Sequence, residues 1–336
     1  MKNRCQWTAA LLTGALLTGV LPTLLLTPAA VRAADPEPSR AGTRFAARLI
    51  LSLHSTEEGP GFRGPRGVST DLFGNIFVAD TGNHRVVHFD PDGRFVFDFG
   101  GYGWDDGELS GPTDVSAREG FRLFVVDAGN ERIQLFDIGD SSPEGAAFPF
   151  REGAGLREEE LVQPTRMDVD SEGRIYVSDE LCHCVWIFSP TGEFVTSLGG
   201  LGDTPSRFRN PAGVAVGPRG RVYVADSGNR RGQVFDPVGN WVSGWGGPAL
   251  DLFDEPTGID VGPDGRVWVS DAGRGVVTAF TAQGSPLFSF GGAGDGPGRF
   301  RAPVDLAVDA SGRVWVCDEL RGVVEGYRIE RVPEEP

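Results

Sequence analysis

The sequence predicts an all-β protein: a six-bladed β-propeller of four-stranded blades in a single domain. Three observations support this. A segment of about 45 residues recurs six times, each copy reads as four short strands separated by turns, and the strand missing from the last copy is found near the start of the chain. Repeats of this length with four strands each are typical of propeller blades. The 49 Gly and 24 Pro among 336 residues agree with many tight turns.

The first 33 residues read as a secretory signal. A basic start at Lys2 and Arg4 precedes an apolar stretch at 9–31, and Val31 and Ala33 satisfy the small-residue rule for cleavage. Two prolines inside the apolar stretch disfavour the alternative, a retained membrane anchor. We therefore predict a Sec-type signal, a periplasmic or extracellular protein, and no transmembrane segment after cleavage.

The mature chain is expected to be strongly acidic. Its net charge of −16 becomes −19 once residues 1–33, which hold three cations and no acid, are removed. Phosphate backbones and anionic lipids repel such a surface, so we expect no nucleic acid partner and no membrane binding. Three cysteines remain in the mature chain, too few for a disulfide scaffold.

The six copies share a proline and an aspartate that are 15 residues apart in every copy. The prolines are Pro65, Pro112, Pro164, Pro211, Pro256 and Pro303, and the aspartates are Asp80, Asp127, Asp179, Asp226, Asp271 and Asp318. Successive copies are 47, 52, 47, 45 and 47 residues apart, a regularity that chance does not produce. The recurrent Asp suits a structural turn, because its carboxylate accepts backbone N–H bonds, and an Arg five residues later suits pairing with a neighbouring Asp.

The repeat divides the chain into predicted segments. Residues 34–45 are expected to form a linker, 46–329 the propeller, and 330–336 an acidic tail that contains proline. The blades are expected near 62–101, 109–150, 161–200, 208–247, 253–292 and 300–329, the last completed by 46–53.

Within the first copy, strands are expected at 67–71, 75–79, 85–89 and 94–99, with a turn at the DPDG sequence of 90–93. The sixth copy stops after its third strand. The segment RLILSLHSTEEGPGF at 48–62 matches EFVTSLGGLGDTPSRF at 193–208, where the third copy forms its outer strand. Residues 48–53 are therefore predicted to complete the last blade, which closes the ring and removes exposed sheet edges.

The consensus P-x-G-V-x-V, V-Y-V-A-D-x-G-N-x-R-V-x-x-F and F-G-G resembles the NHL repeat, and the resemblance covers residues 46–329. It implies a six-bladed propeller. It also raises three kinds of activity: protein binding, RNA binding, and catalysis, as in lyases that act on peptidyl hydroxyglycine with channel histidines holding a metal, or in related calcium lactonases. The acidic charge opposes RNA binding. None of the four histidines (His54, His84, His88 and His183) stands at an inner-strand position, which counts against the lyase.

We predict an exported, monomeric, non-catalytic NHL-type propeller that acts as a protein-binding or scaffold module of the cell envelope and needs no cofactor. Its partner is expected to be a protein or another envelope component. The alternative is a calcium- or zinc-dependent propeller enzyme, either a lactonase-like hydrolase or a lyase, with its site in the central channel.

The inner strand of each blade should line that channel. Two and four residues after the recurrent proline most copies carry Gly, Ala or Ser, and the exceptions are Asp114, Arg166, Asp168, Asp260 and Asp305. Converging carboxylates suit a hard cation such as Ca²⁺, so the four Asp are candidate metal ligands and Arg166 a candidate ligand-binding residue. The competing interpretation is that Arg166 neutralises nearby Asp.

The third copy carries Cys182-His183-Cys184 in its turn, where the first, second and fourth copies have Asn-x-Arg, so the cysteines replace the Asn and the Arg. Two thiolates and an imidazole suit Zn or Cu, although only three ligands are present. A strained disulfide between the two cysteines is a second interpretation. The third is that they are small apolar replacements in a structural turn.

Two loops are candidates for partner binding. The second copy is irregular after Asp137, where a longer acidic segment contains Phe148 and Phe150; it fits a binding loop or a tolerated insertion. Trp104, in the loop at 101–109, is expected either to contact a partner or to cover a seam between blades.

Overall fold

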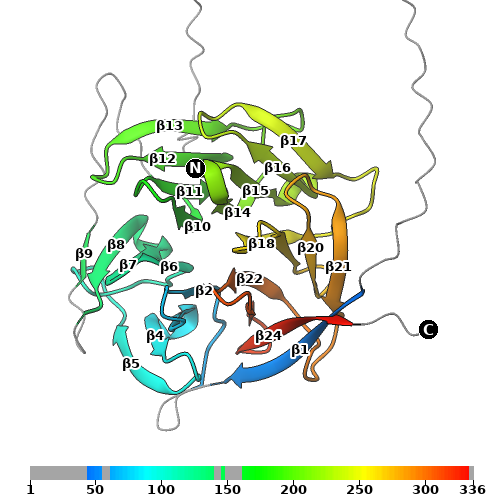
Figure 1. Cartoon of the computed structure of the whole chain (residues 1–336). Helices are drawn as coiled ribbons and strands as arrows, with labels where there is room; N and C mark the ends of the chain where they lie inside the picture. Colours follow the sequence, from blue (N-terminus) through cyan, green and yellow to red (C-terminus); the bar gives the residue numbers. More distant parts are fainter. Residues whose placement is uncertain (1–43, 55–60, 140–144, 148–160, 333–336) are drawn as a thin grey trace, which may run out of the picture. The chain divides into compact units, whose positions relative to one another are not determined.

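The computed structural model describes residues 44–54, 61–139, 145–147 and 161–332. The unit Arg44–Val332 contains six four-stranded antiparallel sheets, arranged as blades around a central channel (Figure 1). The predicted six-bladed all-β propeller is thereby confirmed. Within the part of the chain that the structure describes, no helix is both long and apolar enough to cross a membrane.

Each blade presents one strand to the channel and a second strand that ends at the recurrent aspartate. The inner strands are β2 (Gly67–Thr70), β6 (Asp114–Glu119), β10 (Pro164–Val169), β14 (Pro211–Val216), β18 (Pro256–Val261) and β22 (Pro303–Val308). The second strands are β3 (Ile76–Asp80), β7 (Arg122–Asp127), β11 (Ile175–Asp179), β15 (Val222–Asp226), β19 (Val267–Asp271) and β23 (Val314–Asp318).

The third and fourth strands complete the blades. The third strands are β4 (Arg85–Phe89), β8 (Arg132–Asp137), β12 (Cys184–Phe188), β16 (Arg231–Phe235), β20 (Val276–Phe280) and β24 (Val323–Val332). The outer strands are β5 (Phe95–Gly100), β9 (Gly145–Ala147), β13 (Phe194–Gly199), β17 (Trp241–Gly246), β21 (Pro286–Gly291) and β1 (Arg44–Leu53). Short 3₁₀ turns occur at η1 (Thr81–Asn83), η2 (Ala128–Asn130), η3 (Pro218–Gly220) and η4 (Ser227–Asn229).

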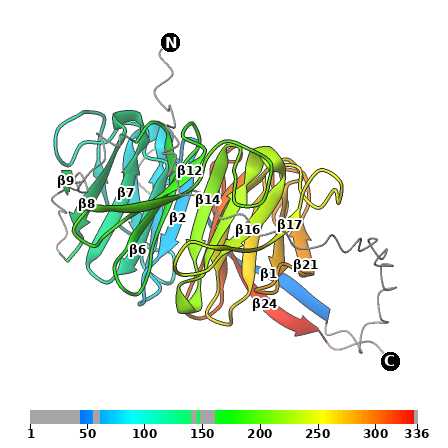
Figure 2. The ribbon, with the colours of Figure 1, turned by 90° about the horizontal axis from the view of Figure 1, so that it is seen from above.

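The last blade closes the ring as the sequence predicts, because β1 is its outer strand and pairs with β24. Both strands have ten residues and pair from Arg44↔Val332 to Leu53↔Val324. The propeller therefore begins two residues before the predicted start at 46 and extends three residues beyond the predicted end at 329. The strands are longer than predicted because β1 and β24 remain hydrogen-bonded to each other up to their last residues. Figure 2 shows this pair running past the rim of the other strands.

The core consists of apolar side chains between neighbouring blades. The fifth residue of each third strand is a large aromatic side chain that is at most 2% exposed; the six are Phe89, Phe136, Phe188, Phe235, Phe280 and Tyr327. Such layers are expected where both faces of a sheet are covered by other sheets. The blades are thus held to one another by apolar burial along every seam.

The recurrent aspartates are buried turn residues. In each blade the carboxylate accepts the backbone N–H of the residue 17 positions earlier, at 2.6–2.8 Å, and so ties the segment before the inner strand to the second strand. The predicted pairing with the following Arg is also present: Nε of Arg231 lies 2.7 Å from Asp226 Oδ2, and Arg85 and Arg132 pair in the same way. The repeat residues therefore maintain the fold.

Candidate functional site

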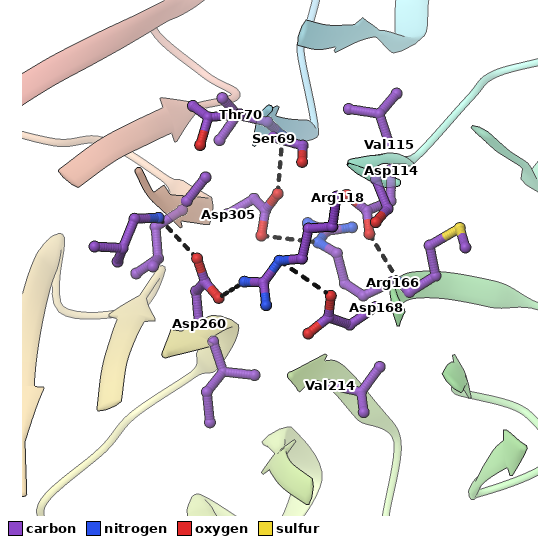
Figure 3. Close-up of a pocket in the computed structure, with 17 residues that line it drawn as sticks. Ser69, Thr70, Asp114, Val115, Arg118, Arg166, Asp168, Val214, Asp260 and Asp305 are labelled. Carbon is purple, nitrogen blue, oxygen red and sulfur yellow. Dashed lines mark hydrogen bonds and ion pairs between the residues drawn. The ribbon is translucent and has the colours of Figure 1, made fainter. Parts of the chain in front are cut away.

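The candidate site is the central channel, where the inner strands bring together the polar residues predicted there. Asp114, Asp168, Asp260, Asp305 and Arg166 all line one cavity (Figure 3). The cavity has a volume of only about 50 Å³. Two guanidinium groups fill the space between the carboxylates, and they divide the site into two ion clusters.

The first cluster is built around Arg166, which is 10% exposed. Its Nε lies 3.3 Å from Oδ1 of Asp305. Its terminal nitrogens donate to four backbone carbonyls, those of Arg66, Thr113, Thr165 and Val304, at 2.9–3.2 Å. One side chain from the third blade thus binds the inner-strand segments of the first, second and sixth blades.

The second cluster is built around Arg118, which the sequence analysis did not single out. Its Nε lies 3.3 Å from Oδ1 of Asp168, and its Nη2 donates to Oδ1 of Asp260. Figure 3 shows its guanidinium between the two carboxylates, which come from the third and fifth blades. The charges of Asp168 and Asp260 raise the pKa of Arg118, so this residue stays charged at every accessible pH.

The position of Arg118 carries a signal that could have identified it. Six residues after the recurrent proline, three blades have an aspartate (Asp71, Asp170 and Asp309) that accepts backbone N–H bonds of the next turn, and two have glycine. Only the second blade has a base there. The side chain of Arg118 is not bonded to the turn as the aspartates are, and it extends into the channel.

The channel carboxylates also join neighbouring blades. Each accepts a backbone N–H from the inner strand of the following blade at 2.7–2.9 Å. The pairs are Asp114 with Met167, Asp168 with Val216, Asp260 with Val308, and Asp305 with Val68. Ser69 does the same for Ala117 at 3.2 Å. Five of the six seams between blades therefore carry, at the axis, a hydrogen bond from a backbone N–H of one inner strand to a side chain of the preceding one; we call these bonds the axial clasps.

Burial sets the charge of these groups. It raises the pKa of Asp168 to about 6, against the opposing effect of Arg118. Burial and the charge of Asp305 raise the pKa of Asp114 well above its ordinary value, and burial also raises that of Asp305. When Asp114 is protonated, the negative charge of Asp305 balances the positive charge of Arg166.

This arrangement is poorly suited to a metal ion. Ca²⁺ needs six to eight oxygen ligands, and here the carboxylate oxygens already face guanidinium groups or backbone N–H groups. Among the described residues, no three His, Cys, Asp or Glu side chains are grouped as a metal site requires. A cation would have to displace Arg118 or Arg166, so the residues present do not fit the calcium ion of the alternative enzyme interpretation.

In the structure, the two cysteines and the histidine of the Cys182-His183-Cys184 motif have different surroundings. Both cysteines are buried in the apolar cluster that contains Trp186 and Phe188. His183 has a left-handed backbone conformation (φ 53°), and its Nδ1 accepts the backbone N–H of Asn210 at 3.1 Å. The histidine therefore ties the third blade to the segment that leads into the fourth.

Of the predicted binding residues outside the channel, Trp104 is 67% exposed, on the loop between the first and second blades. It does not cover a seam. Phe148 and Phe150 lie outside the described residues. The outer strand before them, β9, has three residues, compared with six in β5 and β13, so the irregularity predicted for this blade is present in the fold.

His88 is a partly buried ionisable residue outside the channel clusters, and both of its ring nitrogens are buried. Its ring stacks on Phe77 at 4.5 Å and contacts Phe97 edge-on at 4.8 Å, and neither ring nitrogen has a hydrogen-bond partner among the described residues. The equivalent residues of the other blades are apolar or glycine: Leu135, Ile187, Val234, Ala279 and Gly326. His88 is therefore an exception within the repeat that carries a desolvation cost.

We expect His88→Leu to stabilise the protein by about 1–2 kcal/mol, because it removes two buried nitrogens without partners. Burial lowers the pKa of His88 below 6.5, so the unfolded chain binds its proton first and stability falls as the pH drops below about 6.5. The gain should therefore grow between pH 7 and pH 5, as measured by urea denaturation. Leu135→His, the reverse change at the equivalent position, should destabilise, and a loss of stability in H88L would contradict the prediction.

Comparisons with known proteins agree with the architecture. The NHL repeat family matches residues 62–89 and 208–235. Protein brain tumor of Drosophila melanogaster is 31% identical over 140 residues, which make up 41% of this chain and 12% of that protein. The match thus spans about one eighth of that relative's length.

Solved structures share the fold at low identity. A streptogramin B lyase superposes with a TM-score of 0.61 and 12% identity, covering 85% of this chain and 98% of that one. A gluconolactonase from Xanthomonas campestris gives 0.61 and 18%, covering 84% and 90%. At these sequence identities, the similarity to the solved structures shows a shared fold only. The chain therefore carries NHL repeats folded as a six-bladed β-propeller.

Proposed function

We propose that this propeller is a non-catalytic binding module that takes up its partner on the loops of one face, with the channel serving to hold the ring together. The observation that carries this proposal is the channel itself. Its cavity of about 50 Å³ is far below the roughly 300–1,000 Å³ that small-molecule sites enclose. Its charged groups are bound to one another and to the backbones of neighbouring blades.

The enzymatic alternative finds support only in the fold shared with a lyase and a gluconolactonase. Fold likeness does not carry a site, which depends on particular residues. The four histidines lie in turns, on the third strand of the first blade, or just after β1. None lines the channel cavity. Arg118 pairs with Asp168 and Asp260, Arg166 pairs with Asp305, and all four carboxylates accept backbone N–H groups, so binding a metal or acting as a base would require breaking these contacts.

The partner is proposed to be a protein or another component of the cell envelope, on two grounds. The N-terminal pattern of residues 1–33 predicts export. The acidic surface opposes nucleic acid and anionic lipid. Rigid propeller faces with variable loops suit this role, because the scaffold holds the loops in place while their side chains are free to vary.

The proposal is tested by site-specific photo-crosslinking in cells. One photoreactive residue replaces Leu250, in a loop at one end of β17; another replaces Val238, in the turn at the other end; a third replaces Ser116 in the channel. We expect a saturable protein adduct from one face and none from the channel. Amine-reactive reagents are unsuitable, since Lys2 is the only lysine. Lactone turnover, or a divalent metal retained at one per chain after dialysis, would contradict the proposal.

A further inference from the structure

Three of the loops that connect neighbouring blades have the same length and backbone. They cover residues 102–109, 201–208 and 293–300, and a parallel bridge joins the two ends of each: Tyr102↔Leu109, Leu201↔Phe208 and Ala293↔Phe300. The last residue of each loop also donates its backbone N–H to the Gly that precedes the loop, at 2.7–3.0 Å. The three loops therefore form an internal comparison in which the backbone is constant and the side chains vary.

Side chains of the first loop differ from those of both other loops at six of the eight positions, and the changes at 102, 104 and 108 alter its aromatic and charged character. Trp104 stands where the others have Asp203 and Asp295. Tyr102 replaces Leu201 and Ala293, and Glu108 replaces Arg207 and Arg299. Because the backbone is conserved among the loops, these differences are not needed to form the loop.

Tyr102 and Trp104 form a row of exposed aromatic rings with His84, which we call the aromatic ladder. The His84 and Tyr102 rings lie 4.9 Å apart and the Tyr102 and Trp104 rings 5.2 Å apart, both edge to face. Tyr102 is 60% exposed and Trp104 67%. His84 is fixed because its Nδ1 accepts the backbone N–H of Gly111 at 2.9 Å. Large aromatic side chains held in the open are typical of interface anchors.

The charge around this ladder is negative. The loop contains Asp105, Asp106 and Glu108 and no Arg or Lys. The arginine that reaches it, Arg132, is only 20% exposed and donates to Asp127 and to the carbonyls of Asp105 and Glu108 at 2.8–3.0 Å. Its Nη1 also lies 3.9 Å from Oδ1 of Asp106, whose side chain is nevertheless 62% exposed.

The loop is also held rigidly. Oε2 of Glu108 accepts the backbone N–H groups of Trp104 and Asp105 at 3.0 and 3.1 Å. From the second blade, Asn130 donates to the carbonyl of Gly103 at 2.9 Å, and Gln134 accepts the N–H of Gly107 at 2.9 Å. A surface that is already ordered loses little conformational entropy when it binds.

From these features we propose that Tyr102 and Trp104, flanked by Asp105 and Asp106, dock a cationic segment of a partner protein. An Arg or Lys side chain of that segment lies on the aromatic faces, and the carboxylates pair with its charge. This inference rests on the proposed binding function and assigns it a surface and a class of partner. Neither sister loop can bind in this way, because each carries an arginine and lacks the aromatic pair.

The test uses the mature chain and three labelled peptides of equal length, rich in Gly and Ser and carrying Arg, Lys or Glu. We expect the Arg and Lys peptides to bind in fluorescence anisotropy, more weakly as salt rises, and the Glu peptide not to bind. Trp104→Asp installs the residue that both sister loops carry, so the fold should be retained. It is expected to weaken binding about tenfold. Asp295→Asn, which removes a charge from a sister loop, should leave binding unchanged.

Equal binding by W104D and the parent chain would overturn the assignment, as would binding that weakens in D295N but not in W104D, which would indicate non-specific charge attraction. Preference for a neutral oligosaccharide over the basic peptides would also overturn it, since sugars stack on aromatic rings without needing carboxylates. If the peptides fail while the photo-crosslinking experiment still yields a protein adduct, only the surface assignment is wrong. If both fail, the proposed function is wrong as well.

Discussion

Replacing Arg166 with methionine is expected to lower the free energy of unfolding by about 3–5 kcal/mol, the usual cost of leaving a buried charge without its partner. The loss has two sources. Asp305, 3.3 Å from Nε, keeps a buried charge with no cation beside it. The carbonyls of Arg66, Thr113 and Val304 also lose the donor that joins three blades at the axis.

The measurement is urea denaturation at pH 7, accompanied by calorimetry. The triple variant R166M/D114N/D305N should recover part of the loss, because asparagine removes the charge but can still accept the N–H bonds of Met167 and Val68. Arg94→Met is the control. Its ion pairs with Asp90 and Asp92 are exposed and should contribute less than about 1 kcal/mol. A loss in R166M no larger than in R94M would show that the Arg166 cluster does not stabilise the ring.

The sequence predicted the architecture well because the repeat fixes it. The constant distance from proline to aspartate sets the register of the first two strands, and the match of 48–62 with 193–208 identifies the closing strand. Exact strand ends were less accessible. The residues around Arg44 and Val332 carry no local pattern that predicts how far β1 and β24 pair. The extra length arises from the tertiary contact between the two strands.

The candidate site was predicted in composition but not in arrangement. Strand periodicity correctly placed Asp114, Asp168, Asp260 and Asp305 at the axis. It gave the face on which a side chain lies, and it could not say how far a long side chain reaches across the channel. Arg118 stands at the end of its strand, outside the two positions considered, and spans the distance to two other blades. A search for odd residues at every repeat position would have found it.

The histidines show a second limit of sequence reasoning. His84 and His183 occupy equivalent turn positions, where the second and fourth copies carry Glu131 and Arg230. In the structure both histidines adopt the left-handed backbone conformation and accept a backbone N–H from the segment leading into the next blade. Such bonds join residues 27 apart and depend on the spacing between blades, which no local pattern reveals.

Removal of β1 is expected to have the second large effect. A chain that begins at Phe62 lacks Leu49, Leu51 and Leu53, which pack against the apolar clusters of the last seams. Full burial of a leucine contributes roughly 1.5–3 kcal/mol, and because Leu49 and Leu51 are only partly buried, the three together should contribute about 3–6 kcal/mol. The removal would also expose the whole edge of β24, a ten-residue strand able to pair with another chain. We expect a lower urea midpoint and concentration-dependent oligomers in light scattering.

A chain that begins at Arg44 keeps β1 and should match the full mature protein, which separates the strand's effect from that of the residues before it. A circular permutant gives a stricter control. Because Arg44 pairs with Val332, a short turn can join the end of β24 directly to β1 as a hairpin. This permutant should restore both the midpoint and the monomer. If the chain beginning at Phe62 were instead monomeric and as stable as the parent, closure by β1 would be dispensable, and the ring would depend on its axial clasps and apolar seams alone.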